Sequence, residues 1–378
     1  MKTIRTLVGI FLVTVATTGI AAARQQAAGE IPPASTVDDW PDAAKMEERR
    51  LDAEGLPLFQ GTEPVEVTLT ADFKAVQADR NPESTRMFPA TVQLAGADGG
   101  LVTREIQIRT RGHSRRSYNV CDFAPLRLEL PKGEWKGTAF QGLGGGLKLG
   151  VHCREGVKAF EQYVLREYAA YRIYNLITPQ SFRARLARVT YVDAVKQEPI
   201  STRFGLFIED DDEVAKRMGG RITEERGHLA RLDRDTFTRM TLFEYLIGNV
   251  DVSVIAFHNI VAVQMPSGVV HAVPYDFDYS GLVDASYALP APGLGITTVR
   301  DRVFRGPCRT AEELQAFFDT FRAIRSDIAT MYDSLPEFFD AGAKKRAIGY
   351  LDGFYKTLEK PNDVKKAFLD RCLKRGLM

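Results

Sequence analysis

Between residues 64 and 150, apolar and polar residues alternate in short runs. The clearest runs read VEVTL from Val65, EIQIRTR from Glu105 and LRLEL from Leu126, with shorter ones at 90–94 and 147–149. A period of two places the apolar side chains on one face, which is the pattern of a half-buried β-strand. Turn residues separate the runs, so the segment is expected to form an antiparallel, β-rich half with five or more strands.

The pattern becomes helical at residues 159–176, where apolar side chains recur every three or four positions. Thr178 and Pro179 mark the end of this predicted helix. Two more strands follow, at 185–193 and 204–209, and an acidic run at 210–213 is interpreted as a hinge or a solvated loop. From residue 213 onward the chain is mostly helical, with helices predicted at 213–217, 235–247, 311–335, 336–358 and 361–375.

A hairpin is predicted inside this helical half. Two apolar, β-branched runs, 259–264 and 269–274, flank the turn signal Met-Pro-Ser-Gly. Because a hairpin returns its last residue to the place where its first began, Asn259 and Asp276 are expected to meet at one end of the ribbon. Asp251 lies just upstream, on a loop that Gly248 and Asn249 open, and the irregular segment 281–310 follows as a predicted substrate-facing loop.

Asp251, Asn259, Asp276 and Asp278 are the candidate ligands of a hard cation. Mg²⁺ prefers carboxylate and amide oxygens, retains several waters and takes further ligands from substrate phosphates. The order Asp, Asn, hairpin, Asp therefore predicts a magnesium site. Asp and Asn also close turns and cap helices, so each residue taken alone has a purely structural interpretation.

Composition places the chain among ordinary globular proteins and indicates export. The formal net charge of the 378 residues is +1, which excludes a whole-chain nucleic-acid or membrane-surface footprint. Lys2 and Arg5 precede an apolar stretch at 7–20 and three alanines, which predicts a signal peptide over 1–23; an uncleaved anchor is the alternative. No later run reaches 18 apolar residues, so the mature chain is expected to contain no membrane span and to be periplasmic or secreted.

Four segments follow from these patterns: the signal peptide 1–23, a polar, Pro-containing linker at 24–60, the β-rich part at 61–212 and the helical part at 213–378. The linker contains one charged helical turn near 43–51.

The four cysteines make an even number in a chain expected to enter an oxidising compartment. Three pairings are possible. Cys121 and Cys153 lie in the same β-rich part, which favours that bridge and a second one between Cys308 and Cys372. The spacings match no zinc site, and free buried thiols are the alternative.

Two stretches in the β-rich part have candidate phosphate-binding residues. The strand end at 109–116 contains Arg111 and Arg115 around Gly112, and guanidinium groups with Gly and Ser can cradle phosphate; a solvated, Arg-rich strand end is the alternative. The glycines at 142–146 fit neither the P-loop nor the dinucleotide pattern and indicate a turn. Lys148 alternates with apolar neighbours, so its side chain lies on the opposite strand face, which is usually solvent-exposed.

Six motifs, in order, resemble those of the spore coat protein H (CotH) family of secreted kinases over about residues 100–285. They are IRTRGHSR at 108–115, LREYAAY at 165–171, FGLFIE at 204–209, GNVD at 248–251, HN at 258–259 and PYDFD at 274–278. The resemblance implies an α+β, two-lobed kinase-like fold, with an antiparallel β-rich N-lobe and a mainly helical C-lobe.

The same resemblance implies a role for each candidate residue, with ATP and Mg as cofactors. The catalytic residues would be Asp251, which orients the acceptor hydroxyl, and Asn259. Asn259, Asp276 and Asp278 would bind the metal, Lys148 paired with Glu167 would contact the nucleotide phosphates, and Arg111 and Arg115 would lie over them. The acceptor would be a protein or small-molecule hydroxyl, and nucleotidyl transfer is a close variant. The competing hypothesis is a catalytically inactive envelope protein that binds a partner through 281–310.

Overall fold

The computed structural model describes residues 40–225, 230–335 and 339–374. Residues 41–378 form one compact unit. The predicted signal peptide and the first part of the predicted linker, 24–39, lie outside the described residues. The rest of that linker contains the helix α1 (Ala43–Glu54). Asp42 caps its N-terminus, because the Asp42 side chain accepts a hydrogen bond from the backbone N–H of Lys45.

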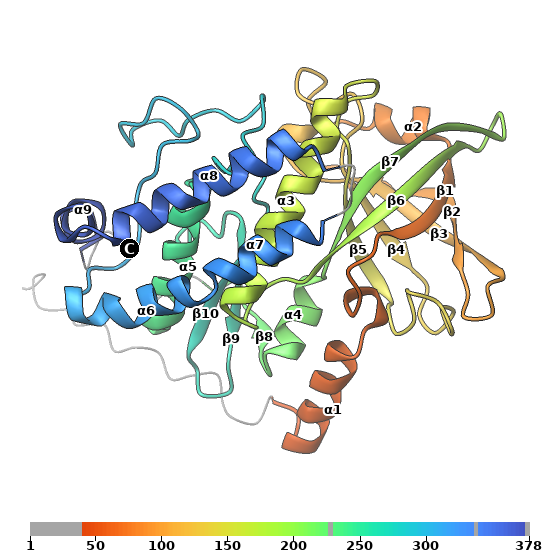
Figure 1. The fold of residues 1–378 in the computed structure, drawn as a ribbon. Helices are drawn as coiled ribbons and strands as arrows, with labels where there is room; N and C mark the ends of the chain where they lie inside the picture. The colour runs from red at the N-terminus through yellow and green to blue at the C-terminus, as the bar shows by residue number, and fades with distance from the viewer. Residues whose placement is uncertain (1–39, 226–229, 336–338, 375–378) are drawn as a thin grey trace, which may run out of the picture. The chain divides into compact units, whose positions relative to one another are not determined.

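Seven strands form a closed barrel in the order β1–β2–β3–β4–β5–β7–β6 (Figure 1). Their bounds are β1 Val65–Ala71, β2 Phe88–Ala95, β3 Leu101–Thr110, β4 Leu126–Leu130, β5 Gly145–Gly150, β6 Ala184–Asp193 and β7 Glu198–Ile208. Neighbouring strands pair antiparallel, except that β6 closes the barrel on β1 in parallel, with Val65 opposite Ala187.

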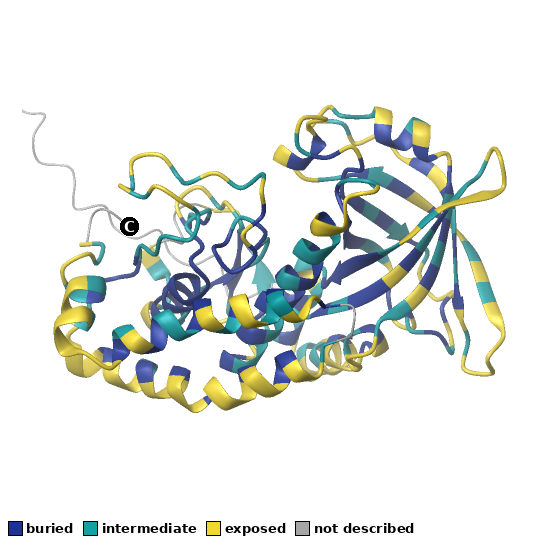
Figure 2. Cartoon of the chain, turned by 45° about the horizontal axis from the view of Figure 1, so that its top comes forward, coloured by how far each residue is buried: buried dark blue, intermediate teal, exposed yellow. Residues whose placement is uncertain are grey.

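Alternation along the barrel strands matches their burial. In β1, Val67, Leu69 and Ala71 are buried while the residues between them are partly exposed, and Figure 2 shows the same change of colour along the strands. The buried side chains join one apolar cluster, in which the rings of Phe73, Phe123 and Tyr191 pack together. Burying each large apolar side chain contributes about 1.5–3 kcal/mol, so the predicted strand faces are the ones that stabilise the barrel.

The prediction of a two-lobed kinase-like fold, with an antiparallel β-rich N-lobe and a mainly helical C-lobe, is wrong. Barrel closure overturns it, because β6 and β7 join β1 to β5 and complete a mixed sheet of seven strands. The individual strand predictions are confirmed, with β4 at the predicted bounds. A period of two shows which face of a strand is buried, but it is the same in an open sheet and in a closed barrel.

The helices and a small second sheet form the rest of the unit. The helices are α2 Phe73–Ala78, α3 Lys158–Ile177, α4 Asp211–Arg217, α5 Arg234–Ile247, α6 Ala311–Ala323, α7 Arg325–Asp333, α8 Ala341–Leu358 and α9 Pro361–Val364. α3 lies against β6 and β7 and contacts α7, and α5 contacts α8 (Figure 1). The sheet has the order β10–β9–β8, with β8 Arg221–Ile222, β9 Ile260–Gln264 and β10 Val270–Pro274.

Three predicted helices differ in detail from the structure. The one predicted over 336–358 is α8, which begins at Ala341, and 336–338 lie outside the described residues. The helix predicted over 311–335 divides into α6 and α7 at Ile324, and the one predicted over 361–375 is α9 followed by a π-helical turn at Lys365–Leu369. The segment 281–310 contains no helix or strand, as predicted. The hairpin is confirmed as β9 and β10, which pair antiparallel from Gln264 opposite Val270 to Ile260 opposite Pro274.

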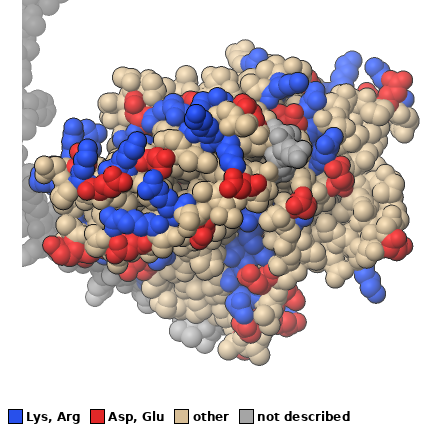
Figure 3. Space-filling view, viewed as in Figure 1, with Lys and Arg blue, Asp and Glu red and all other residues tan. Residues whose placement is uncertain are grey.

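Both predicted disulfides are present, Cys121–Cys153 and Cys308–Cys372, and no cysteine is free. In the part of the chain that the structure describes, no helix has the length and apolar character needed to cross a bilayer. Basic and acidic side chains are interspersed on the face shown in Figure 3, in keeping with the small net charge. The disulfides fit an oxidising compartment.

Candidate functional site

The base of the β9–β10 hairpin places Asn259 and Asp276 side by side. The backbone N–H of Tyr275 donates to the carbonyl of Asn259 at 3.0 Å, directly beyond the last ladder pair. Asn259 and Asp276 both have left-handed backbone conformations, with φ of 53° and 63°. These conformations are uncommon outside glycine, although Asn and Asp tolerate them best. The predicted meeting of the two residues is therefore confirmed.

Asp251 is held next to Asn259 by side-chain hydrogen bonds. α5 ends at Gly248, whose φ of 67° turns the chain into the loop that carries Asp251. The side-chain amide of Asn259 donates to the carbonyl of Asp251 at 2.7 Å and to its Oδ2 at 3.1 Å. His258 Nε2 lies 3.0 Å from Oδ1. The carboxylate keeps 38% of its exposure, so it is oriented and still reachable from solvent.

Arg115 is the centre of a buried ionic cluster. Its guanidinium donates to Asp276 Oδ1 at 2.7 Å, and its Nε lies 3.3 Å from Asp278 Oδ2. Glu167 Oε2 on α3 is 3.9 Å away. The Arg115 side chain is only 8% exposed, so these contacts lie where water screens them little. The turn after β3, the helix α3 and the hairpin base thus meet at one guanidinium.

The three acids of this cluster titrate differently. Burial would raise the pKa of Asp276, but the charges of Arg115 and Arg111 reverse this and lower it. Burial outweighs Arg115 at the other two acids, raising the pKa of Asp278 to about 6 and that of Glu167 to about 8. Near neutral pH, Asp276 is therefore charged and Glu167 is protonated. Glu167 Oε1 also has no hydrogen-bond partner among the described residues.

Lys148 is close to this cluster but is not paired with Glu167, so that prediction is wrong. Lys148 is 5% exposed, and its ammonium group forms an ion pair with Asp211 at the start of α4. It also lies 4.8 Å from the ring centre of Tyr275 and 5.0 Å from that of Phe182. Burial lowers the pKa of Lys148, and Asp211 opposes this. The solvent-facing alternative for Lys148 does not hold either.

Arg111 has a charge that no side chain pairs. The half-buried guanidinium forms no hydrogen bond or ion pair within the described ranges. Its positive charge nevertheless lowers the pKa of Asp276 and of Glu167, and it also lowers the pKa of Lys148. The charge of Arg111 therefore acts on the cluster although no acidic side chain of the described residues pairs with it, so an anion could bind there.

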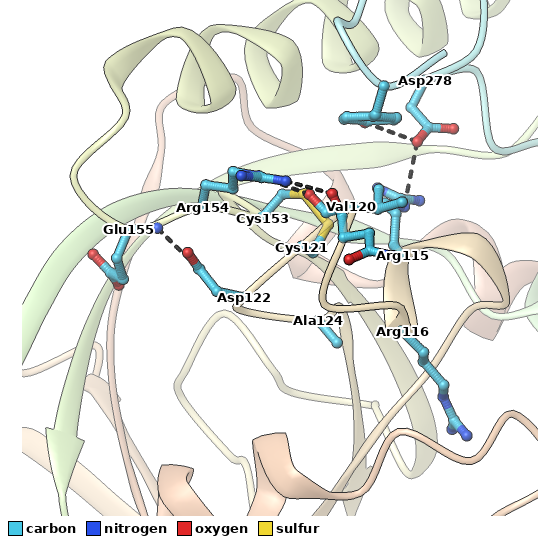
Figure 4. Close-up of a disulfide and its surroundings, with 12 residues drawn as sticks. Arg115, Arg116, Val120, Cys121, Asp122, Ala124, Cys153, Arg154, Glu155 and Asp278 are labelled. Carbon is cyan, nitrogen blue, oxygen red and sulfur yellow. Dashed lines mark hydrogen bonds and ion pairs between the residues drawn. A yellow bond between two sulfur atoms is a disulfide. The ribbon is translucent and has the colours of Figure 1, made fainter. Parts of the chain in front are cut away.

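A disulfide fixes the turn that carries Arg115. Figure 4 shows Cys121–Cys153 joining this turn to the segment after β5, with Arg115 reaching from the turn to Asp278. Arg154, next to Cys153, donates from Nε to the carbonyl of Val120 at 2.9 Å. A covalent link and a guanidinium bond therefore restrain the backbone on which the site depends.

Three side chains of the site were not among the predicted residues. Asp211 lies in the acidic run interpreted as a hinge or solvated loop, whereas Asp210 caps α4 there and Asp211 pairs with Lys148. The Tyr287 hydroxyl donates to Asp278 Oδ2 at 2.9 Å, and its place in the 281–310 loop was the available signal. Tyr171, whose hydroxyl accepts from the backbone N–H of Asp276 at 2.9 Å, appeared in the sequence as part of an apolar helix face.

Two of the predicted metal ligands, Asn259 and Asp276, lie at the hairpin base and could offer an amide oxygen and a carboxylate oxygen to a cation. Across the described residues, no group of three or more His, Cys, Asp or Glu side chains is arranged to hold a metal. Asp276 and Asp278 both contact Arg115, which limits what they offer a cation. The amide nitrogen of Asn259 makes both bonds to Asp251. Its side-chain oxygen accepts no hydrogen bond from the described residues. An amide and a carboxylate oxygen suit Mg²⁺ when phosphates complete the coordination.

The arrangement therefore combines three cationic side chains, an oriented carboxylate and two candidate cation ligands. Such a set can bind a polyanion and orient a hydroxyl beside it. No family model matches the chain, and no curated protein matches it either.

Proposed function

We propose that this protein is an exported phosphotransferase, which binds the phosphates of a nucleotide at the Arg115 cluster and transfers one phosphoryl group to a hydroxyl. The supporting observation is that Arg115 contacts Asp276, while the charges of Arg111 in the same turn and of Lys148 on β5 are near enough to lower the pKa of Asp276. Asp251 is near enough for its charge to raise the pKa of Asp278. The six motifs that resemble those of CotH kinases contain Arg111, Arg115, Asp251 and Asp276, and this resemblance also supports a phosphotransferase.

The three cationic side chains would take different roles. Arg111, which has no close partner, would donate to phosphate oxygens first. Phosphate oxygens would then compete with Asp276 for Arg115. The buried ammonium group of Lys148 would add a compact positive charge. Bonds between charged groups contribute about 1.5–3 kcal/mol each, so losing one should weaken nucleotide binding by roughly tenfold or more.

Magnesium, when bound with the nucleotide, would neutralise phosphate charge and would be held by Asn259 and Asp276, with Asp278 as a further candidate. Asp251 would accept the proton of the acceptor hydroxyl, whose oxygen forms the new P–O bond while the bond to the nucleoside diphosphate breaks. The hydrogen bonds from Asn259 and His258 would keep the Asp251 carboxylate in one orientation during this transfer.

The test combines binding and transfer on the mature chain with both disulfides oxidised. Thermal unfolding is followed during a Mg-ATP titration, and γ-phosphate transfer to casein and to small alcohols is measured separately. Asp251→Asn should reduce transfer by about 100-fold or more while leaving nucleotide affinity within about twofold. Arg111→Gln should weaken nucleotide binding about tenfold, because it removes a charged donor.

Arg104→Gln is the matched control for Arg111, since Arg104 lies on β3, the strand that Arg111 directly follows, and has its charge at the surface. It should change neither measurement. A chain that shows no saturable response to Mg-ATP, or an Asp251→Asn variant that transfers phosphate at the wild-type rate, would overturn the proposal.

The non-catalytic hypothesis has one observation in its favour. Arg115 already contacts both Asp276 and Asp278, the two carboxylates that a metal would use. A protein that only binds a partner through the 281–310 loop would not need Arg115 to release either carboxylate. A silent Mg-ATP titration, together with a tight protein partner recovered through that loop, would support this second function.

A further inference from the structure

A small hollow of about 50 Å³, partly open to solvent, lies between α5 and the loop that follows it. α5 contributes Phe237, Met240, Thr241 and Glu244, whose three- and four-residue spacing places them on one helix face. The loop contributes Val252 and Val254. None of the cationic residues of the Arg115 cluster lines this hollow, so it is a separate place in the fold.

Glu244 is a buried carboxyl group without a partner in this hollow. The residue is 3% exposed, and neither carboxyl oxygen has a hydrogen bond from the described residues. The side-chain amide nitrogen of Asn249 also lacks a partner. Asn249 faces the carboxyl closely enough to favour its charged form, yet the two groups are outside hydrogen-bonding geometry.

Unpartnered buried polar groups are rare in folded proteins, and each needs a physical explanation. Here the surroundings are apolar, apart from Asn249, Thr241, Ser253 and Arg305. Burial raises the pKa of Glu244 to about 8, and the charge of Asp251 adds to this effect. Arg305 lines the hollow, but its guanidinium donates to the carbonyls of Val250 and Val252 at 3.0 Å.

We propose that this hollow binds a small primary alkylammonium ion, whose ammonium group donates hydrogen bonds to the Glu244 carboxylate while its alkyl chain packs on the apolar wall. An ammonium group has three donors, enough for both carboxyl oxygens. An anionic ligand could not form an ion pair with the Glu244 carboxylate and would be repelled by the nearby charge of Asp251, and an alcohol has a single donor. The inference does not depend on the phosphotransferase proposal.

Binding changes the protonation of Glu244 in a way that can be measured. At pH 7 the unliganded carboxyl is mostly protonated, because its pKa is about 8. The ion pair requires the carboxylate, so the proton moves from Glu244 to solvent when the ammonium ion enters. Binding of a charged amine at pH 7 should therefore release roughly one proton.

The experiment titrates the oxidised full chain with n-butylammonium chloride by calorimetry at pH 7, in buffers of different ionisation enthalpy. n-Butanol and sodium butyrate are the comparison probes. n-Butylammonium should bind saturably with release of about one proton, at least tenfold more tightly than either comparison probe. Glu244→Gln keeps the shape of the side chain and should lose both the affinity, by at least tenfold, and the proton release.

Val254→Phe provides a second variant, because it fills the hollow from the loop and leaves Glu244 in place. It should also abolish binding. The proposal is overturned if n-butylammonium does not bind saturably, if Glu244→Gln binds it as the wild type does, or if binding releases no proton.

Discussion

Replacing Arg115 with methionine should destabilise the protein, and the loss should grow as the pH rises. Methionine keeps the length of the aliphatic part and removes the positive charge. Asp276, Asp278 and Glu167 would then remain buried together without the cation that all three contact. Removing one partner of a buried ion pair costs about 3–5 kcal/mol, because the remaining charge has lost its compensation.

The distances indicate how this loss is divided. At an effective dielectric constant of about 20, unit charges separated by the observed 2.7 Å and 3.3 Å attract by about 6 and about 5 kcal/mol before desolvation is subtracted. The Glu167 contact at 3.9 Å contributes little near neutral pH, because the pKa of Glu167 is about 8 and the group is protonated. Asp276 and Asp278 therefore account for most of the effect.

The direction of the pH dependence follows from the same groups. Arg115 lowers the pKa of Asp276, so this pair contributes stability above the unfolded pKa and loses it in acid. Without Arg115, burial raises the pKa of Asp276, and a group with a raised folded pKa loses stability as the pH rises. Protonation relieves the variant near pH 5, where a loss of about 1 kcal/mol is expected, against about 3–5 kcal/mol at pH 8.

Urea unfolding followed by tryptophan fluorescence at pH 5 and pH 8, with the disulfides intact, measures both values. Arg346→Met is the control, since Arg346 makes an exposed ion pair with Asp340 at 3.4 Å and should cost less than about 1 kcal/mol at either pH. Adding Asp278→Asn to Arg115→Met should recover part of the loss at pH 8. A loss at pH 8 no larger than that at pH 5 would refute the reasoning.

Three further predictions concern other parts of the unit. Glu167→Gln should flatten the pH dependence of the free energy of unfolding between pH 5 and pH 8. The pKa of Glu167 in the wild type is about 8, so its stability falls as the pH rises through this range. Urea unfolding at both pH values would contradict this if the variant and the wild type changed with pH by the same amount. Replacing Cys308 and Cys372 with serine should lower the free energy of unfolding by about 4 kcal/mol, since the bond closes a separation of 64 residues; denaturant titration showing a loss below about 1 kcal/mol would count against it. Lys148→Met should weaken Mg-ATP binding about tenfold in the thermal titration, and an unchanged affinity would remove Lys148 from the site.

The sequence alone located the local elements of this protein. Alternation gave β4 at its observed bounds, and three- and four-residue spacing gave α3 to within one residue at each end. The hairpin turn at 265–268 placed Asn259 and Asp276 together, and the cysteine count with the β-rich segment led to the correct disulfide pairs. The strand, the helix and the hairpin depend on neighbours in the chain, so a local pattern is sufficient to specify them. The disulfide pairs join residues 32 and 64 positions apart, and the small number of cysteines left only three pairings to choose from.

Tertiary structure decided the rest. The parallel pairing of β6 with β1 closes the barrel, and strand patterns do not indicate which strands become partners. Glu167 contacts Arg115 rather than Lys148, which pairs with Asp211, and sequence order cannot rank such distant alternatives. The raised pKa of Glu167 has the same origin, because burial by residues far away in the chain sets the cost of its charge. Pairing and desolvation are properties of the packed chain, whereas periodicity is a property of each segment.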